Sequence, residues 1–347
     1  MTTSFPLLNL PSEAILHVIK SMDFGEFISF SLLSKRAKKS VGSMNWKYIC
    51  SIVYISSEIR LYIALDTTRM DWTFKLRKGR AGGLSLLPKK VELRLLTDPP
   101  GNVKRRMKGG LNIKEWISHL KQIFHFSKFH FLKFDENTSR FDIKELRTLF
   151  CSYDKVDILS DNRSDVKSIL KHFPSRHMLF EDDVFKNLEN PHQVLIQNYD
   201  DLEIRQVTRQ STLTLDDLLV INSRTINISN IGWTEKELNR FLKLWIKGSN
   251  PRMERLRIHF FSREPLKKSD IFKGIKCTEF PPEHTRWFKS DIEKECTVKG
   301  GYDFNRCDGT KASIEFKIFD NRKYLDMNVH YLGEVDEMEK MILLMCL

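Results

Sequence analysis

The first 44 residues restrict the fold more than any other part of the chain, because they hold more apolar helix faces than so short a segment can bury. Apolar residues recur at the spacing of one helical face between Ile15 and Met22. Asp23, with Glu26 three residues later, forms a capping box that starts a second helix. A cationic run from Lys35 closes the segment. We predict two or three short packed helices with an apolar surface left over for a partner.

Two stretches of this segment match a known motif. Leu10–Glu13 and Ser31–Arg36, with Asp23 between them, resemble the F-box pattern. The resemblance implies docking on the Skp-type adaptor of a cullin–RING ubiquitin ligase. The residues that it assigns to adaptor binding are Leu10, Pro11, Ile15, Ile19, Leu32 and Leu33. The chain departs from the pattern at Gly25 and Ala37, where bulkier residues are frequent, and an ordinary amphipathic helical hairpin is the alternative.

Length and composition exclude several classes of protein. The 347 residues allow one large domain or two to three smaller ones. No apolar run is long enough for a transmembrane helix, and residues 1–13 lack the basic and apolar regions of a signal peptide. Six cysteines without a CxxC pair are typical of reduced thiols. We therefore expect an intracellular protein, cytoplasmic or nuclear.

The net charge of +12 is concentrated in the first third of the chain. Residues 1–110 hold 19 Lys or Arg against 8 Asp or Glu. Part of this excess falls in two segments that we interpret as loops, Lys75–Lys90 and Lys104–Lys108. A basic region of this kind leaves a second function open, nucleic-acid binding through the amino-terminal third, with an affinity that falls steeply with salt.

The hydrophobic pattern divides the chain into four segments. Residues 1–46 are the segment that the resemblance assigns to the F-box, and Trp46–Cys50 is expected to finish the helical region. Residues 47–110 alternate apolar and polar residues from Glu58 onward, which predicts a small antiparallel sheet with one buried face. Its glycine-rich loop Gly79–Gly83 lacks the spacing of a phosphate-binding loop.

Residues 111–265 alternate helix-like and strand-like segments. The strand centres recur about every 22 to 30 residues, a spacing typical of leucine-rich and related α/β solenoids. This pattern favours parallel strands backed by helices, and we predict a leucine-rich-repeat-like, curved α/β domain, with an ordinary open α/β domain as the alternative. Leu215–Leu219 and Leu238–Pro251 resemble the type 2 F-box-associated domain of a nematode-type expanded family, which implies recruitment of a target protein.

Residues 266–347 change pattern again. Asp308-Gly309 predicts a tight hairpin, and the strands around it predict a small antiparallel meander. Glu334–Leu347 is expected to end the chain as an amphipathic helix. The fold class is thus α+β and α/β: a helical F-box, a small antiparallel sheet, a repeat-like α/β domain and a β-meander.

No residue pattern indicates chemistry of its own. The ten histidines show no zinc-ligand spacing, and His119, His125 and His130 are interpreted as packing or exposed residues. No nucleophile elbow is present. We expect no cofactor and no metal, and we interpret the chain as a non-catalytic substrate adaptor of an SCF-type ligase that presents a target protein for ubiquitination. The target surface has no sequence signature.

Overall fold

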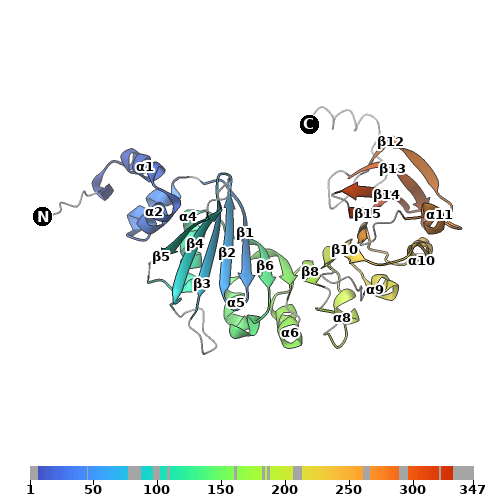
Figure 1. Ribbon diagram of the computed structural model, residues 1–347, viewed down its shortest axis with the longest axis horizontal. Helices are drawn as coiled ribbons and strands as arrows, with labels where there is room; N and C mark the ends of the chain where they lie inside the picture. The colour runs from blue at the N-terminus through green and yellow to red at the C-terminus, as the bar shows by residue number, and fades with distance from the viewer. Residues whose placement is uncertain are drawn as a thin grey trace. The chain divides into compact units, whose positions relative to one another are not determined.

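A computed structural model describes residues 7–44, 46–76, 87–96, 102–107, 110–159, 162–181, 184–185, 188–205, 213–260, 266–288, 296–319 and 322–330. The chain forms two compact units, residues 1–175 and 176–347 (Figure 1). Each unit is described by itself. Among the described residues, no helix is long and apolar enough to cross a membrane.

Short helices open the first unit, and two of them, α2 and α3, begin at a residue whose side chain caps the helix. The Asp23 carboxylate accepts a hydrogen bond from the Glu26 N–H at 3.0 Å, and Glu26 accepts one from the Asp23 N–H, as in the predicted capping box. The Ser34 hydroxyl likewise accepts from the Ala37 N–H. These elements are η1 (Leu7–Asn9), α1 (Ser12–Ser21), α2 (Phe24–Ser31) and α3 (Lys35–Gly42).

A mixed sheet makes up the rest of the first unit, in the order β7-β6-β1-β2-β3-β4-β5. Neighbours from β1 to β5 are antiparallel, whereas β1–β6 and β6–β7 are parallel. The strands are β1 (Tyr48–Ile55), β2 (Ile59–Leu65), β3 (Arg69–Lys75), β4 (Lys90–Leu96), β5 (Asn102–Met107), β6 (Phe129–Phe134) and β7 (Tyr153–Ile158).

Two local predictions for this region are wrong. Trp46–Cys50 does not finish the helical region, because Tyr48 begins β1, the strand that joins the antiparallel and parallel parts of the sheet. The basic segment at Lys104 is not a loop, because residues 102–107 pair with β4 as the last strand of the order. Gly79–Gly83 lies outside the described residues.

Helices of the first unit pack on the sheet through large aromatic side chains. The rings of Trp116 on α4 and Trp72 on β3 lie 5.6 Å apart, and both side chains are buried. Phe134 and Phe173 meet in the same way, with 4.8 Å between their ring centres. The helices are α4 (Ile113–Ile123), α5 (Ile143–Leu149) and α6 (Arg163–His172), with the 3-10 turn η2 (Thr138–Arg140).

The second unit begins with the helix–strand alternation that the sequence predicts. Strands β8 to β11 are parallel neighbours, joined by segments that contain short helices. In this part the elements are β8 (His177–Glu181), α8 (His192–Leu195), β9 (Asp201–Arg205), α9 (Leu215–Val220), β10 (Thr225–Ile231), α10 (Glu235–Ile246) and β11 (Arg255–Phe260). Trp245 and Phe241 of α10 are buried, and a Thr234–Glu237 capping box starts this helix.

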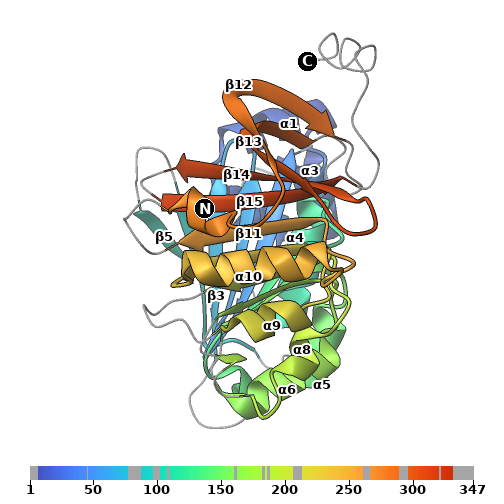
Figure 2. The same ribbon diagram turned by 90° about the vertical axis from the view of Figure 1, so that its right-hand side faces the viewer.

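An antiparallel meander completes the second unit. Strand β15 pairs with β11, and β14, β13 and β12 follow outward in that order (Figure 2). The bounds are α11 (Lys268–Ile271), β12 (Thr278–Phe288), β13 (Cys296–Asn305), β14 (Lys311–Phe319) and β15 (Arg322–His330). The hairpin predicted at Asp308-Gly309 connects β13 and β14. The predicted helix Glu334–Leu347 lies outside the described residues.

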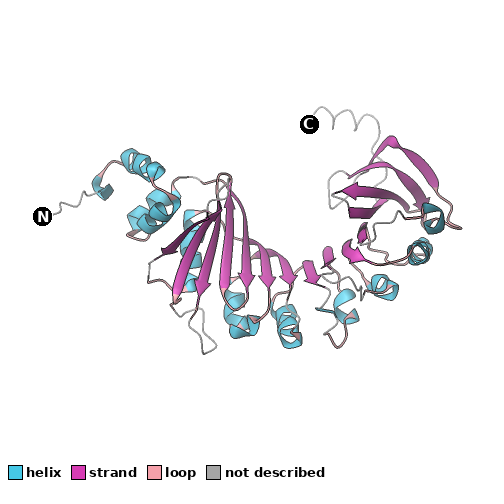
Figure 3. Cartoon of the chain, viewed as in Figure 1, coloured by secondary structure: helices cyan, strands magenta, loops and turns pink. Residues whose placement is uncertain are grey.

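The fold is thus a helical F-box region followed by mixed sheets (Figure 3). The parallel pairing and the two antiparallel segments agree with the predicted class. The leucine-rich-repeat-like description and the four-part division at residues 46, 110 and 265 stay predictions.

Candidate functional site

Two of the six predicted adaptor-binding residues are buried in the core of the F-box helices. Ile15 and Ile19 are each 1% exposed and occupy the buried face of α1, which contacts α3. Their spacing of four places them on the same helical face, and that face is taken up by the chain's own core. Their structural role is to pack the helices against one another.

The other four predicted residues are accessible to a partner. Leu33, in the turn that follows α2, is 72% exposed, an unusual degree of exposure for a leucine. Pro11 is exposed at the start of α1, and Leu10 and Leu32 are half-buried. An apolar surface of the kind that the sequence predicts is therefore present, with Leu33 as its most exposed member.

Leu33 borders a groove between α2 and β5, with a volume of about 590 Å³. We call it the α2–β5 groove. Its floor is partly apolar, because Phe30 and Met107 line it, and two arginines of β5 add positive charge. The complete lining is Gly25, Glu26, Ser29, Phe30, Leu33, Arg105, Arg106 and Met107.

Gly25 has a specific role in this groove. The Arg105 side chain lies across α2, and its Cδ atom would be 2.5 Å from a Cβ atom placed on Gly25. The guanidinium of Arg105 reaches Asp23, with 2.5 Å between Nη2 and Oδ2. Gly25 therefore departs from the usual F-box pattern at the point where an arginine from outside the motif crosses the helix.

The F-box helices are anchored on the rest of the first unit. The Ser31 hydroxyl and His119 Nε2 on α4 are 2.7 Å apart, and both residues are buried. Lys38 Nζ donates to the side-chain amide oxygen Oε1 of Gln122 at 2.6 Å, and His125 Nε2 lies 2.7 Å from the Gly42 backbone carbonyl oxygen. Each contact joins an F-box helix to α4 or to the residues just after it.

Two of the three histidines that we interpret as packing or exposed residues take part in these contacts. His119 and His125 hold α2 and α3, and His130 Nδ1 lies 3.1 Å from the Tyr48 hydroxyl. Burial, together with the nearby charge of Lys38, lowers the pKa of His119 to about 4, so this imidazole is neutral at pH 7. Among the described residues, no cluster of His, Cys, Asp or Glu is arranged to hold a metal ion.

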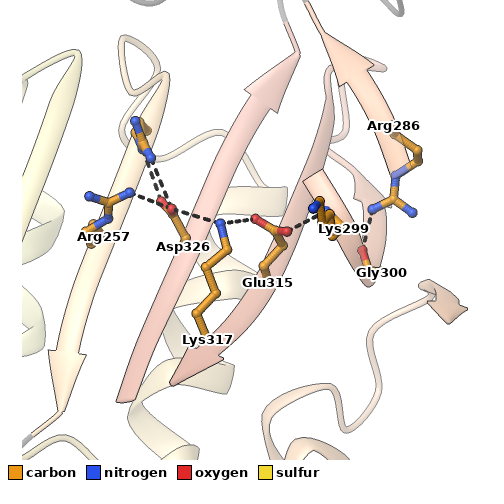
Figure 4. Close-up of polar contacts among 8 residues, drawn as sticks. Arg257, Arg286, Lys299, Gly300, Glu315, Lys317 and Asp326 are labelled. Atoms are coloured by element: carbon orange, nitrogen blue, oxygen red, sulfur yellow. Dashed lines mark hydrogen bonds and ion pairs between the residues drawn. The ribbon is translucent and has the colours of Figure 1, made fainter. Parts of the chain in front are cut away.

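A second candidate surface lies on the sheet of the second unit (Figure 4). Arg255 and Arg257 of β11 both bind the Asp326 carboxylate of β15, at 3.1 and 2.7 Å. Lys317 of β14 binds Glu315 at 2.6 Å and lies 3.7 Å from Asp326. We call these five residues the charged face.

On the charged face the carboxylates are buried, whereas two of the cations are partly exposed to solvent. The Asp326 side chain is 1% exposed and the Glu315 side chain 3%, whereas those of Arg257 and Lys317 are 36% and 46% exposed. Burial would raise the pKa of Asp326, but the hydrogen bonds from Arg255 and Arg257 hold it below its usual value. The carboxylates therefore lie underneath and position the cations that reach solvent.

Sequence reasoning missed both the β5 part of the groove and the charged face. Arg105 and Met107 belong to no F-box pattern, and their segment reads as a basic loop. Asp326 meets Arg255 across 71 residues of sequence. Alternation in 322–330 could place Asp326 opposite the apolar face, but no local signal could name its partners.

Comparison with known proteins agrees with the two resemblances. The F-box domain model matches residues 7–49, and the model described as F-box associated matches residues 190–258, from α8 to β11. The F-box associated domain-containing protein sdz-33 of Caenorhabditis elegans is 26% identical over 338 residues, which cover 95% of this chain and 99% of that protein. No solved structure matches the chain. The chain therefore carries an F-box domain that is followed by an F-box-associated domain.

Proposed function

We propose that this protein is the substrate-recognition subunit of an SCF-type ubiquitin ligase and docks on a Skp-type adaptor through its F-box. The observation that carries the proposal is the exposed Leu33 beside the α2–β5 groove, within a matched F-box. Leu10, Pro11 and Leu32 extend this apolar surface. Apolar side chains that enter a partner's groove are where binding energy concentrates.

The adaptor role requires no chemistry from this chain. The second unit would hold a target near the ubiquitin-charged enzyme, and the rate would rise because the target's effective concentration rises. In this proposal the protein is a non-catalytic, intracellular adaptor. Its helix–strand repeats serve as a leucine-rich-repeat-like scaffold, supported by the parallel pairing of β8 to β11.

The charged face is our proposed contact surface for the target. Arg257 and Lys317 reach solvent from positions fixed by buried carboxylates, so little side-chain freedom is lost when they bind. A target that approaches this face meets ordered cations on β11 and β14, the two strands on either side of β15.

Adaptor docking is tested by pull-down of a Skp-type adaptor with the full-length protein. We expect Leu33→Asp to abolish retention, because a carboxylate cannot enter an apolar contact without a large desolvation cost. Leu87→Asp is the matched control, since Leu87 is 59% exposed and lies outside the F-box. Retention by Leu33→Asp equal to that of the control would contradict this docking surface, and no retention by the unmodified protein would contradict docking itself.

Full-length variants are preferable to removal of the F-box. Helix α2 contacts the buried His119 of α4 through Ser31, and α3 contacts Gln122 through Lys38, so deletion of these helices would expose part of the first unit. Ile15→Asp is also unsuitable, because it would place a charge in the F-box core.

A further inference from the structure

A second groove lies on the F-box, between α3 and the end of α4, with a volume of about 640 Å³. Three lysines line it, Lys35, Lys38 and Lys39, with Gln122 and His125 on the α4 side. We call it the lysine groove. Because the lysines stand at positions i, i+3 and i+4 of α3, they share one face of the helix.

These cations are not neutralised by the part of the chain that the structure describes. The side-chain contacts there are one hydrogen bond from Arg36 to the Leu10 carbonyl oxygen and one from Lys38 to Gln122. No described carboxylate forms an ion pair with Lys35, Arg36, Lys38 or Lys39. The groove therefore presents unbalanced positive charge.

Two of the cations lie at the unfavourable end of the helix, although Lys39 stands in the last turn, where a cation is favourable. Lys35 and Arg36 occupy the first turn of α3, where the helix dipole favours acidic residues, and this turn contains none. The three lysines on one face also repel one another. The stability of α3 comes instead from the burial of Ala37 and Val41, so the fold gives no reason for lysines on the opposite face.

We propose that the lysine groove binds an acidic segment of a protein partner. Clustered carboxylates would offset the repulsion between the lysines and would interact favourably with the α3 amino terminus. A protein segment fits better than a nucleic acid, because the lining offers no aromatic platform on which bases could stack: its one ring, His125, is bonded to the Gly42 carbonyl. This site is separate from the α2–β5 groove, and its occupant need not be the adaptor.

The test measures binding of fluorescein-labelled octaglutamate to the full-length protein by anisotropy, with octaglutamine and oligouridylate as comparison ligands. We expect octaglutamate to bind, with an affinity that falls between about 50 and 200 mM salt, and octaglutamine not to bind. The double variant Lys35→Glu with Lys39→Glu should weaken binding about tenfold or more. Both lysines are exposed, so a folded variant is expected, and circular dichroism checks it.

The matched control is Lys89→Glu with Lys114→Glu, which changes the net charge equally at two exposed lysines outside the groove. It should weaken binding by no more than about twofold. Equal loss in both double variants would overturn the proposal, because binding would then follow net charge alone. Absence of octaglutamate binding, or tighter binding of oligouridylate that depends on Lys35 and Lys39, would also overturn it. Adaptor retention is measured separately, so either proposal can fail alone.

Discussion

Ser31 and His119 form a buried hydrogen bond of 2.7 Å that ties the F-box to α4. The Ser31 hydroxyl also lies 2.6 Å from the Ile28 carbonyl oxygen, to which it donates its single proton. Ser31 must therefore accept from His119 Nε2–H, so the imidazole, which is neutral at pH 7, carries its proton on Nε2. The F-box thus depends on a histidine that lies 88 residues away in sequence.

This arrangement predicts that the F-box loosens in mild acid. The pKa of His119 is about 4 in the folded protein and about 6.5 when unfolded, so the unfolded state takes up the proton first as the pH falls. The stability contribution is complete above pH 6.5 and declines toward pH 4, with a loss of about 2 kcal/mol at pH 5. Hydrogen exchange of the α2 and α4 amides at pH 7 and pH 5, corrected for intrinsic rates, measures this loss.

The control for this effect uses two histidine variants. His119→Gln keeps a donor and an acceptor without a titrating ring, so its α4 protection should depend less on pH. His17 is exposed on α1, and His17→Gln should retain the dependence of the unmodified protein. An unchanged pH dependence in His119→Gln would mean that another group is responsible.

At position 301 of the meander, we predict that only glycine fits without a steric clash. The φ of Gly301 is +86°, and an added Cβ would lie within overlap distance of the Ile314 carbonyl oxygen. Because that oxygen belongs to the backbone of β14, Gly301→Ala should destabilise the second unit by more than about 3 kcal/mol. Gly309 is the control, with a φ of +90° and open space, so Gly309→Ala should cost only about 1 kcal/mol. Urea denaturation compares the two, and equal losses would show that backbone conformation alone matters.

We predict that loss of the negative charge of Asp326 strongly destabilises the second unit. Asp326→Asn would leave Arg255 and Arg257 without their carboxylate, so the second unit should lose about 2 to 4 kcal/mol of unfolding free energy. Asp308→Asn is a suitable control, because Asp308 is half-exposed and pairs with Arg306 only two residues away. A loss no greater than that of the control would mean that solvent replaces the carboxylate at little cost.

Local patterns were sufficient to predict much of this fold. The capping box at Asp23 and the turn at Asp308-Gly309 predicted where elements end, because each depends on residues a few positions apart. Strand β1 was missed because it follows the F-box helices directly and its pairing with β6 is about 80 residues distant. The sequence pattern also could not predict which apolar side chains are exposed to solvent. Ile15 and Leu33 are both apolar F-box residues, and only the packing of the helices shows that Leu33 is the one that faces solvent.

Glu92 lies at the centre of a lysine cluster on the first unit. Its carboxylate is 2.6 Å from Lys90 Nζ, 3.1 Å from Lys75 Nζ and 3.2 Å from Lys104 Nζ. The hydrogen bond from Lys90 is the main reason that the pKa of Glu92 falls to about 2. Burial alone would raise this pKa, and the hydrogen bonds from the other two lysines lower it further. The cluster connects β3, β4 and β5, so it stabilises the strand that borders the α2–β5 groove.

The low pKa of Glu92 predicts a second loss of stability, at a lower pH than that of His119. The unfolded carboxylate, with a pKa of about 4.5, binds its proton before the folded one, so the stabilisation present above pH 4.5 is lost as the pH falls toward 2. Because the lysine side chains are about half-exposed, we expect a contribution of about 1 to 2 kcal/mol. Urea denaturation between pH 5 and pH 3 should show a smaller loss in Glu92→Gln than in the unmodified protein. Glu136→Gln removes an exposed carboxylate and should leave the loss unchanged, and the same loss in all three proteins would assign the acid sensitivity to other groups.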